Sequence, residues 1–189
     1  MAVDNPLYAS PNTLSLPKEP LLAGVVLIEP CMAQNVGTIA RLCQCAGVPL
    51  YLVGKLGFEL HDRGFKKNFK RTAMDYMPPD ALQHYPHYEA LCQALNRGHR
   101  SDNIITDQPA YYLSSKAVKT HWEASYTQET LLVFGSEATG LPEPWVKAHP
   151  ETSLRIPMHP EGRSLNIAVS VGIVLYEALR QRTLAQGKA

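Results

Sequence analysis

Two short stretches in the last third of the chain place small and polar residues directly after apolar, strand-like runs. Residues 131–134 (Leu-Leu-Val-Phe) lead into Gly135, Ser136 and Glu137. Residues 156–158 (Ile-Pro-Met) lead to Ser164-Leu165-Asn166. Strands that end in tight polar loops are common ligand sites in α/β proteins, because backbone amides are free there and glycine allows close approach. These two strand-to-loop junctions form the candidate site.

Two familiar nucleotide-binding patterns do not fit these stretches. Gly135 to Gly140 has the G-x-x-x-x-G outline of a P-loop, but Leu141-Pro142 follows where a P-loop carries Lys and then Ser or Thr. No G-x-G-x-x-G follows the first apolar strand, residues 24–28. The sequence therefore disfavours nucleoside triphosphate hydrolysis and ordinary dinucleotide binding.

The elements that must position the site alternate between strands and helices. Residues 24–28 predict a buried strand, residues 35–47 a helix with Asn35 as N-cap and Gly47 as terminator, and residues 49–54 a second strand. A strand, helix and strand within about thirty residues imply a parallel sheet. Further strands are expected at 111–113, 131–134 and 154–156, and further helices at 61–71, 88–95, 142–145 and 164–179.

Length and composition fit one α/β domain. The chain has 189 residues and a formal net charge of +1, so nothing global favours nucleic acid or membrane. We expect a domain at residues 21–182, a disordered or surface-draped Pro-rich tail at 1–20 and a flexible tail at 183–189. There is no apolar run of about 18 residues and no signal-peptide pattern, which predicts a cytoplasmic protein without membrane association.

The cysteines indicate thiols and no metal. Cys31, Cys43, Cys45 and Cys92 form no C-x-x-C pair, and no histidine stands at zinc-ligand spacing from two of them. We expect four reduced cysteines, with a structural zinc as the alternative.

Two further features concern binding surfaces. Positive charge concentrates at 61–71, where Arg63, Lys67 and Lys70 share a helical face beside Lys66 and Arg71. This face suits phosphate contacts, and an ordinary solvated surface is an equally weighted alternative. The final helix is apolar nearly all round apart from a thin polar stripe, which favours burial against a partner subunit and predicts a homodimer.

Three segments, taken in order, resemble the motifs of the SpoU branch of the SPOUT RNA methyltransferases. They are Asn35-x-Gly37-x-x-x-Arg41, then Phe134-Gly135-x-Glu137-x-x-Gly140-Leu141, then Ile156-Pro157-Met158 with Ser164-Leu165-Asn166. Within that branch, Arg41-Leu42-Cys43-x-x-x-Gly47, Gly57-Phe58 and residues 73–76 resemble the small tRNA wobble-ribose 2′-O-methyltransferases of the TrmL (YibK) type.

The resemblance implies a parallel-sheet α/β fold with a C-terminal trefoil knot, an obligate homodimer, and S-adenosylmethionine as methyl donor to tRNA or another structured RNA. The cofactor pocket would be built from Leu113, Gly135, Ile156, Met158, Ser164 and Leu165. The basic helix would hold tRNA backbone.

The resemblance also assigns roles near the chemistry. Asn35 belongs to the first motif, Glu137 would brace the loop, Ser164 would orient the pocket and Asn166 would lie near the donor methyl. Arg41 would reach the cofactor bound by the partner subunit. Because arginine is protonated at neutral pH, we interpret Arg41 as an electrostatic clamp in preference to a base. Pattern alone favours a solvated flank residue at that position.

Two departures from the TrmL-type pattern bear on the substrate. Ile167-Ala168-Val169 follows Asn166 where a second Asn is typical, and the Pro-rich tail and the insert at 98–109 are unusual. Methylation of rRNA or of another tRNA position therefore stays an alternative. A catalytically silent RNA-binding dimer on the same scaffold is the rival from another class.

Overall fold

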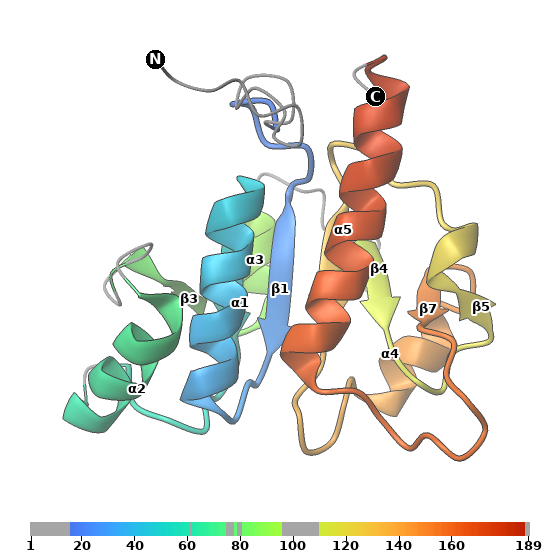
Figure 1. Cartoon of the computed structure of the whole chain (residues 1–189). Helices are drawn as coiled ribbons and strands as arrows, with labels where there is room; N and C mark the ends of the chain where they lie inside the picture. Colours follow the sequence, from blue (N-terminus) through green and yellow to red (C-terminus); the bar gives the residue numbers. More distant parts are fainter. Residues whose placement is uncertain (1–15, 61, 75–77, 79–80, 96–109, 188–189) are drawn as a thin grey trace, which may run out of the picture.

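One sheet of parallel strands forms the centre of the molecule in the computed structural model (Figure 1). The structure describes residues 16–60, 62–74, 78, 81–95 and 110–187. The strands are β1 (Gly24–Ile28), β2 (Leu50–Val53), β3 (Gln83–Tyr85), β4 (Ala110–Leu113), β5 (Lys119–Thr120), β6 (Leu131–Phe134) and β7 (Ser153–Arg155). They stand in the order β3-β2-β1-β6-β4-β7-β5, and every pairing is parallel. The predicted parallel α/β fold is confirmed.

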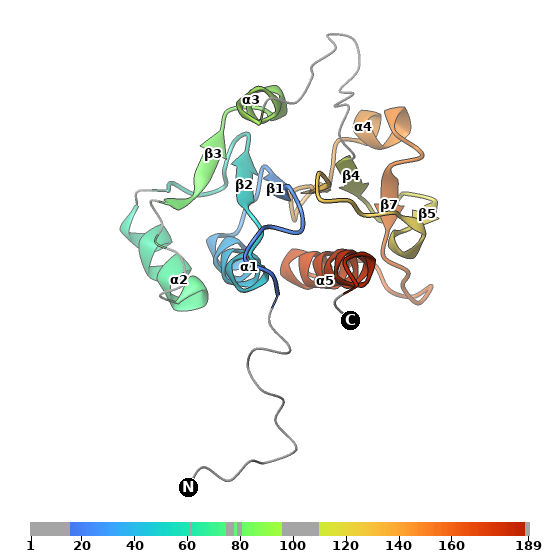
Figure 2. The same ribbon diagram turned by 90° about the horizontal axis from the view of Figure 1, so that it is seen from above.

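Helices cover both faces of this sheet (Figure 2). One face carries α1 (Ala33–Ala46), α2 (Arg63–Ala73) and α5 (Ile167–Ala185), and the other carries α3 (Tyr88–Ala94) and α4 (Glu143–Ala148). Strand residues alternate between the two cores, as the pleat requires. In β1, Val25 and Leu27 face α1 and α5, whereas Val26 and Ile28 face α3 and α4.

The helix α1 packs closely on α2 because residue 37 is glycine. A Cβ at that position would collide with Thr72 Oγ1 and lie 3.1 Å from the Phe69 carbonyl oxygen. Helix α1 ends as predicted at Gly47, which takes a left-handed conformation (φ 63°) and donates its N–H to the carbonyls of the last turn.

Helix α2 has the predicted face pattern. Phe65, Phe69 and Ala73 are buried at i, i+4 and i+8, so the lysine and arginine side chains project outward. The Asp62 carboxylate begins the helix by accepting hydrogen bonds from the amides of Gly64 (2.6 Å) and Phe65 (3.4 Å).

Two predicted helix starts are wrong, and both errors involve asparagine. Asn35 is the third residue of α1 and not its N-cap, because its side chain is used in tertiary hydrogen bonds. Helix α5 begins at Ile167 instead of Ser164, because Asn166 is the N-cap and accepts from the amides of Ala168 and Val169. The same helix continues past the predicted end at residue 179 to Ala185, and Gly187 takes a left-handed conformation (φ 66°) just beyond its last turn.

Some predicted features fall outside the described residues, and two strands were not predicted. Residues 1–15 of the expected tail and the insert at 98–109 lie outside the described ranges. Strands β3 and β5 are short and largely polar, so they give no apolar signal. In the part of the chain that is described, no helix is both long and apolar enough to cross a membrane.

Candidate active site

A cavity of about 500 Å³ lies at the carboxyl ends of β4, β6 and β7, beside the first turn of α5. Three strand-end loops form its walls. The lining side chains include the apolar residues Leu113, Leu154, Ile156, Met158 and Leu165. Polar groups reach it from Ser114, Lys116, Glu137, Ser164 and Asn166. The cavity therefore combines an apolar slot with a few convergent polar groups, the usual composition of a small-molecule site.

A hydrogen-bonded chain of side chains joins the three motif segments at this cavity. The Glu137 carboxylate accepts from Asn35 Nδ2 (3.0 Å) and from the Cys31 backbone amide (2.7 Å). Asn166 Nδ2 in turn donates to Asn35 Oδ1 (3.1 Å). These residues lie more than 100 positions apart in the sequence, so only the fold brings them together.

The network fixes the orientation of both asparagine amides. Asn166 Oδ1 accepts from the backbone amides that begin α5, at 2.8 Å and 3.4 Å, so its Nδ2 faces Asn35. Asn35 must then present its oxygen to Asn166, which leaves its own Nδ2 for the Glu137 carboxylate. A carboxylate at position 35 could not make both contacts.

The loop after β6 is tight because it begins and ends with glycine. A Cβ on Gly135 would collide with the backbone of Gly140 and Leu141. Gly140 has a left-handed φ of 71° and donates its amide to the Ser136 carbonyl at 2.8 Å. This geometry holds Glu137 at the mouth of the loop, where Asn35 reaches it.

Most of the sequence-predicted site residues lie on this cavity. All six residues expected to bind the cofactor line it, namely Leu113, Gly135, Ile156, Met158, Ser164 and Leu165. Asn35, Glu137 and Asn166 line it as well and are hydrogen-bonded to one another.

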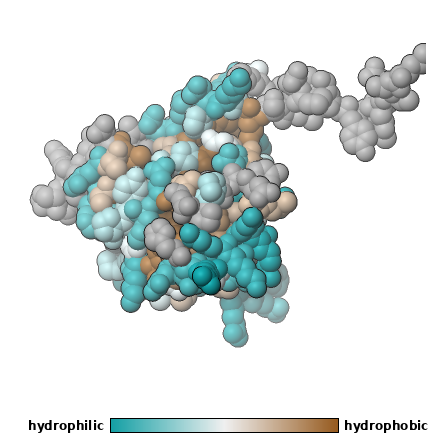
Figure 3. All heavy atoms as spheres, turned by 90° about the vertical axis from the view of Figure 1, so that its left-hand side faces the viewer, coloured by the Kyte–Doolittle hydropathy of each residue, from teal (hydrophilic) through white to brown (hydrophobic). Residues whose placement is uncertain are grey.

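Arg41 and the basic helix lie elsewhere in the protomer. Arg41 is exposed on α1, six residues beyond Asn35 and therefore about 9 Å along the helix axis, and it does not line the cavity. The α2 side chains Arg63, Lys66, Lys67, Lys70 and Arg71 are all exposed. Figure 3 faces this side of the molecule, where hydrophilic residues gather over the lower part that α2 occupies.

Two residues at or beside the cavity were not predicted as site residues. Cys31 does not line the cavity, but its amide donates to Glu137 and its Sγ lies 3.0 Å from Ser136 Oγ. Lys116 lies on the cavity wall and pairs with Glu143 at 3.4 Å. Cys31 follows the end of β1, and Lys116 follows the end of β4. Searching the loop after every predicted strand for polar residues, and not only the two in the last third of the chain, would have found both.

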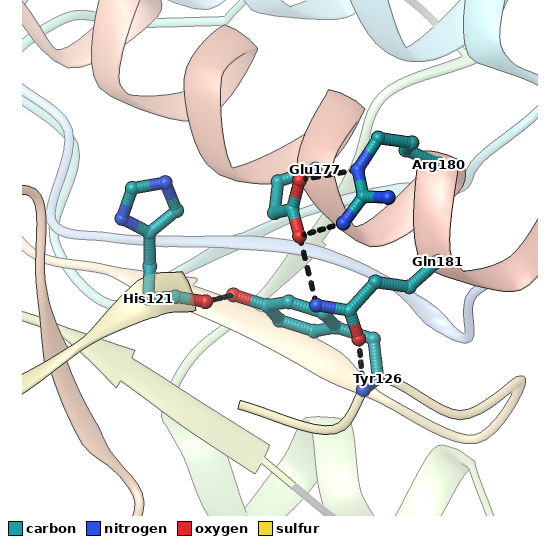
Figure 4. Close-up of polar contacts among 5 residues, drawn as sticks. All are labelled: His121, Tyr126, Glu177, Arg180 and Gln181. Atoms are coloured by element: carbon teal, nitrogen blue, oxygen red, sulfur yellow. Dashed lines mark hydrogen bonds and ion pairs between the residues drawn. The ribbon is translucent and has the colours of Figure 1, made fainter. Parts of the chain in front are cut away.

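One group of titratable side chains with shifted pKa values lies under α5, away from the cavity (Figure 4). Hydrogen bonds from Arg180 lower the pKa of Glu177 to about 2, and Gln181 also donates to this carboxylate at 2.8 Å. His121 is buried, which lowers its pKa. The Tyr126 hydroxyl donates to the His121 carbonyl at 2.8 Å, which joins the short helical turn at His121–Glu123 to the loop before β6.

The cysteines and carboxylates do not assemble a metal site in the described ranges. No group of three or more His, Cys, Asp or Glu side chains is placed there to hold a metal ion. All four cysteines are free thiols, two buried and two exposed. Burial raises the pKa of the Cys43 thiol to about 12, which suits a core residue.

A parallel α/β sheet with a ligand cavity built from three strand-end loops defines an enzyme-like binding domain. Residues 23–176 match the SpoU rRNA methylase family, and the chain therefore belongs to that family.

The relatives narrow this class. A Methylovorus glucosotrophus (strain SIP3-4) protein named tRNA (cytidine(34)-2′-O)-methyltransferase is 37% identical over 162 residues, covering 85% of this chain and 96% of that protein. A solved structure described as "Structural insights into the 2-OH methylation of C/U34 on tRNA" is 36% identical with a TM-score of 0.72, covering 87% of this chain and 99% of that one. The Streptomyces viridochromogenes SpoU methyltransferase AviRb, solved with AdoMet, shares the fold at 23% identity, a TM-score of 0.67, and coverage of 88% and 62%.

Proposed function

We propose that this protein is an S-adenosylmethionine-dependent tRNA ribose 2′-O-methyltransferase that acts on the wobble cytidine or uridine. The observation that carries the proposal is the hydrogen-bonded chain Glu137–Asn35–Asn166, which unites the three family motifs at one cavity. Relatives at 36–37% identity that match nearly their whole length support the wobble position and a tRNA substrate. Its place of action is then the cytoplasm, where tRNA is modified.

The cavity fits the proposed cofactor. Leu113, Ile156 and Leu165 offer apolar surface for an adenine ring, and glycine at 135 and 140 exposes backbone for hydrogen bonds. Lys116 supplies a positive charge for the amino-acid carboxylate. When bound, S-adenosylmethionine supplies an electrophilic methyl group on a sulfonium.

The chain's own residues then have to position a ribose and stabilise its oxygen. A ribose hydroxyl is a poor nucleophile and must lose its proton as it attacks. In our proposal Arg41 acts as an electrostatic clamp on the target phosphate or on the developing alkoxide. The Glu137–Asn35–Asn166 chain holds the loop and the start of α5 in register, so that Ser164 and Asn166 keep their places on the cavity wall.

The proposal requires a homodimer, because Arg41 does not line the cavity of its own protomer. Helix α5 exposes the apolar side chains Val169 (51%), Ile173 (37%) and Tyr176 (49%) beside α1, on which it packs. An apolar stripe of this kind on a long helix suits a symmetric subunit interface. In our proposal this interface brings Arg41 to the partner's cavity, and the loops around the cavity form the trefoil knot of the family.

The exposed basic face of α2 completes the proposal as the surface that holds tRNA. Its five cations lie on a helix whose apolar side is fully used against the core, so their charges are free to meet phosphates. Binding should weaken steeply with salt if this face carries the contact.

The test is methyl transfer from labelled S-adenosylmethionine to unmodified tRNA and rRNA, followed by mapping of the labelled nucleoside. A 2′-O-methylated wobble nucleotide is the expected product. Label in rRNA or at another tRNA position would support the alternative substrate, and cofactor binding without transfer would support a silent RNA-binding dimer. Arg41→Ala should reduce transfer at least about 100-fold while cofactor binding and melting temperature hold.

The cofactor assignment needs its own variant. Gly135 is unsuitable because any side chain there would collide with the loop backbone. Ser164→Trp fills the cavity from an exposed loop position and should abolish cofactor binding without lowering the melting temperature. Arg163→Trp is the matched control, since Arg163 is exposed in the same loop and does not line the cavity. Equal cofactor affinity in the two variants would contradict the assignment.

A further inference from the structure

A second cavity, of about 470 Å³, adjoins the first on the α3 and α4 side of the loop after β6. Five residues line both cavities: Lys116, Ser136, Thr139, Gly140 and Leu141. The second cavity lies at the carboxyl ends of β1 and β2. The strand order reverses at β1, because β2 and β3 lie on one side of it and the later strands lie on the other. Open α/β sheets bind ligands at such a reversal of strand order. The site assignment above leaves this cavity unused.

The inner wall of the second cavity suits a flat ring. Ile28, Val53 and Leu141 are buried aliphatic residues on its wall, and Tyr88 and Trp145 are its aromatic ones. The Tyr88 and Trp145 rings lie 5.4 Å apart between centroids, at 50°. Tyr88 is buried behind Trp145, so the half-buried Trp145 is the ring of this pair on which an unpaired base of single-stranded nucleic acid can stack.

The three carboxylates on the cavity wall, Glu29, Glu89 and Glu143, differ in their partners. Glu143 is bound by Lys147 at 2.8 Å and by Lys116 at 3.4 Å, which lowers its pKa. Glu89 lies 3.2 Å from His87 Nδ1, but that nitrogen accepts the Ala90 amide as the N-cap of α3 and therefore donates nothing to Glu89. Of these two carboxylates, only Glu143 has its hydrogen-bonding capacity taken up by cations.

Glu29 is exposed at the carboxyl end of β1 and differs from Glu143. Within the described residues, its carboxylate has no hydrogen-bond or ion-pair partner, although its amide is anchored to the Val53 carbonyl at 2.8 Å. Its backbone takes a positive φ of 48°, and its side chain crosses Gly54, where an added Cβ would lie 2.9 Å from Glu29 Cγ. Strained residues of this kind cluster at functional sites.

An apolar slot edged by the unpaired carboxylate of Glu29 selects a ring that carries an amino group. A carboxylate accepts hydrogen bonds from the exocyclic amine of guanine, adenine or cytosine, and guanine presents two adjacent donors, N1–H and the 2-amino group. We propose that the second cavity holds a guanine base of a nucleotide next to the methylated one, with Glu29 accepting from its 2-amino group. This inference rests on the proposed function, and the shared loop 136–141 is its structural reason, because neighbouring nucleotides need adjoining sites.

The first test uses RNA hairpin substrates that carry guanosine or inosine at each neighbour of the target in turn. Inosine lacks only the 2-amino group. Wild-type protein should methylate the guanosine hairpin at about tenfold higher kcat/KM at one of the two positions. Glu29→Gln should reduce this preference below about twofold, whereas Glu151→Gln should keep it, because Glu151 is a highly exposed carboxylate at the opposite end of β7.

The second test does not depend on methyl transfer. The chain has two tryptophans, so Trp122→Phe leaves Trp145 as the sole indole reporter, and Trp122 is 64% exposed. The guanosine hairpin should quench Trp145 fluorescence, and Glu29→Gln should weaken this binding about tenfold. Free guanosine monophosphate should not quench at the same concentrations.

The outcomes separate the two proposals. Quenching of Trp145 fluorescence by the hairpin without methyl transfer would contradict the proposed activity and support the base site. Wild-type indifference to inosine at both neighbours would overturn the base site, as would a preference that survives Glu29→Gln. Equal quenching by the free nucleotide would assign the cavity to a small ligand and reject the RNA neighbour.

Discussion

At the scale of single residues, Asn35 is the member of the network that no other residue type replaces. Its carboxamide donates to Glu137 and accepts from Asn166, so it needs one donor and one acceptor on a short side chain. The residue is 9% exposed, and water cannot substitute freely for either partner. Asn35 thus has a structural role, because it links the family's three motif segments.

Asn35→Asp keeps the size of the side chain and places a carboxylate against Glu137. We expect it to lower the free energy of unfolding by about 2 to 3 kcal/mol, because a charged hydrogen bond is lost and a buried repulsion appears. Methyl transfer should fall about 100-fold or more, since the cavity loops lose their register. Urea unfolding and transfer assays measure both effects.

The control for this variant is Gln34→Glu, which adds the same charge at the exposed preceding residue. It should change stability and activity little. An Asn35→Asp protein with wild-type stability would show that the network does not hold the fold together.

His121 provides a pH-dependent stability at the same scale. Burial lowers its pKa in the folded state, while a backbone hydrogen bond at Arg155 and the nearby Glu177 act in the opposite direction. The unfolded protein therefore binds more protons here than the native one, so the contribution of His121 is lost as the pH falls below the ordinary histidine range. The Glu177 carboxylate, with a pKa of about 2, remains ionised throughout that window.

We expect the melting temperature of wild type to drop more between pH 8 and pH 5 than that of His121→Gln. Thermal unfolding of both proteins at the two pH values measures the difference, and His87→Gln serves as a control at a highly exposed histidine. Parallel pH profiles for wild type and His121→Gln would refute the linkage.

At the scale of elements, the contact between α1 and α2 places the motif helix against the basic helix. Gly37 makes this contact possible, because a Cβ there would meet Thr72 and the Phe69 carbonyl. Gly37, the glycine of the first motif, therefore has a role in helix packing that does not involve the cofactor cavity. A change at Gly37 should move both the basic face and Asn35.

Gly37→Ala should destabilise the protein by about 1 to 3 kcal/mol, the usual cost of overpacking. Helix propensity alone predicts the reverse, a gain of about 1 kcal/mol. Adding Thr72→Ala should recover part of the loss, because it removes the hydroxyl that the new methyl meets. Thr38→Ala, an exposed change on the same helix, should be nearly neutral in the same denaturation experiment.

At the scale of the whole molecule, the proposed site is completed by two subunits. Within one protomer, Arg41 does not line the cavity. Helix α5 exposes an apolar stripe beside α1, the helix that carries Arg41. If the stripe forms the interface, each cavity meets its arginine only in the dimer. In each site, Arg41→Ala then changes the subunit that supplies the arginine, and Ser164→Trp changes the subunit that supplies the cavity.

Co-expression of these two inactive variants tests the arrangement. A mixed dimer has one site with both defects and one intact site, so random pairing should restore about a quarter of wild-type transfer activity. Differently tagged chains, purified in tandem, isolate the mixed dimer for the assay. The Arg41→Ala/Ser164→Trp double variant co-expressed with either single variant should remain inactive, and equal failure of the simple mixture would place Arg41 in its own subunit's site.

Much of this architecture followed from short-range patterns. The buried strands at 24–28 and 131–134, the basic amphipathic helix and the terminator Gly47 were each predictable, because burial and capping impose local periodicity. Strands β3 and β5 escaped prediction because they lie at the edges of the sheet and bury little. A hydrophobic pattern exists only where a strand face is covered.

The sequence by itself determined which residues could form a site, because the three motifs occur in order along the chain. They include the strand-end glycines, Ser164 and Asn166. Only the tertiary structure decided how they combine. It moved Asn35 from a helix cap to the centre of a network, placed Arg41 away from its own cavity, and opened a second cavity at Glu29. The physical reason is that caps and periodicity depend on neighbours along the chain, whereas hydrogen bonds over more than 100 residues depend on the sheet order.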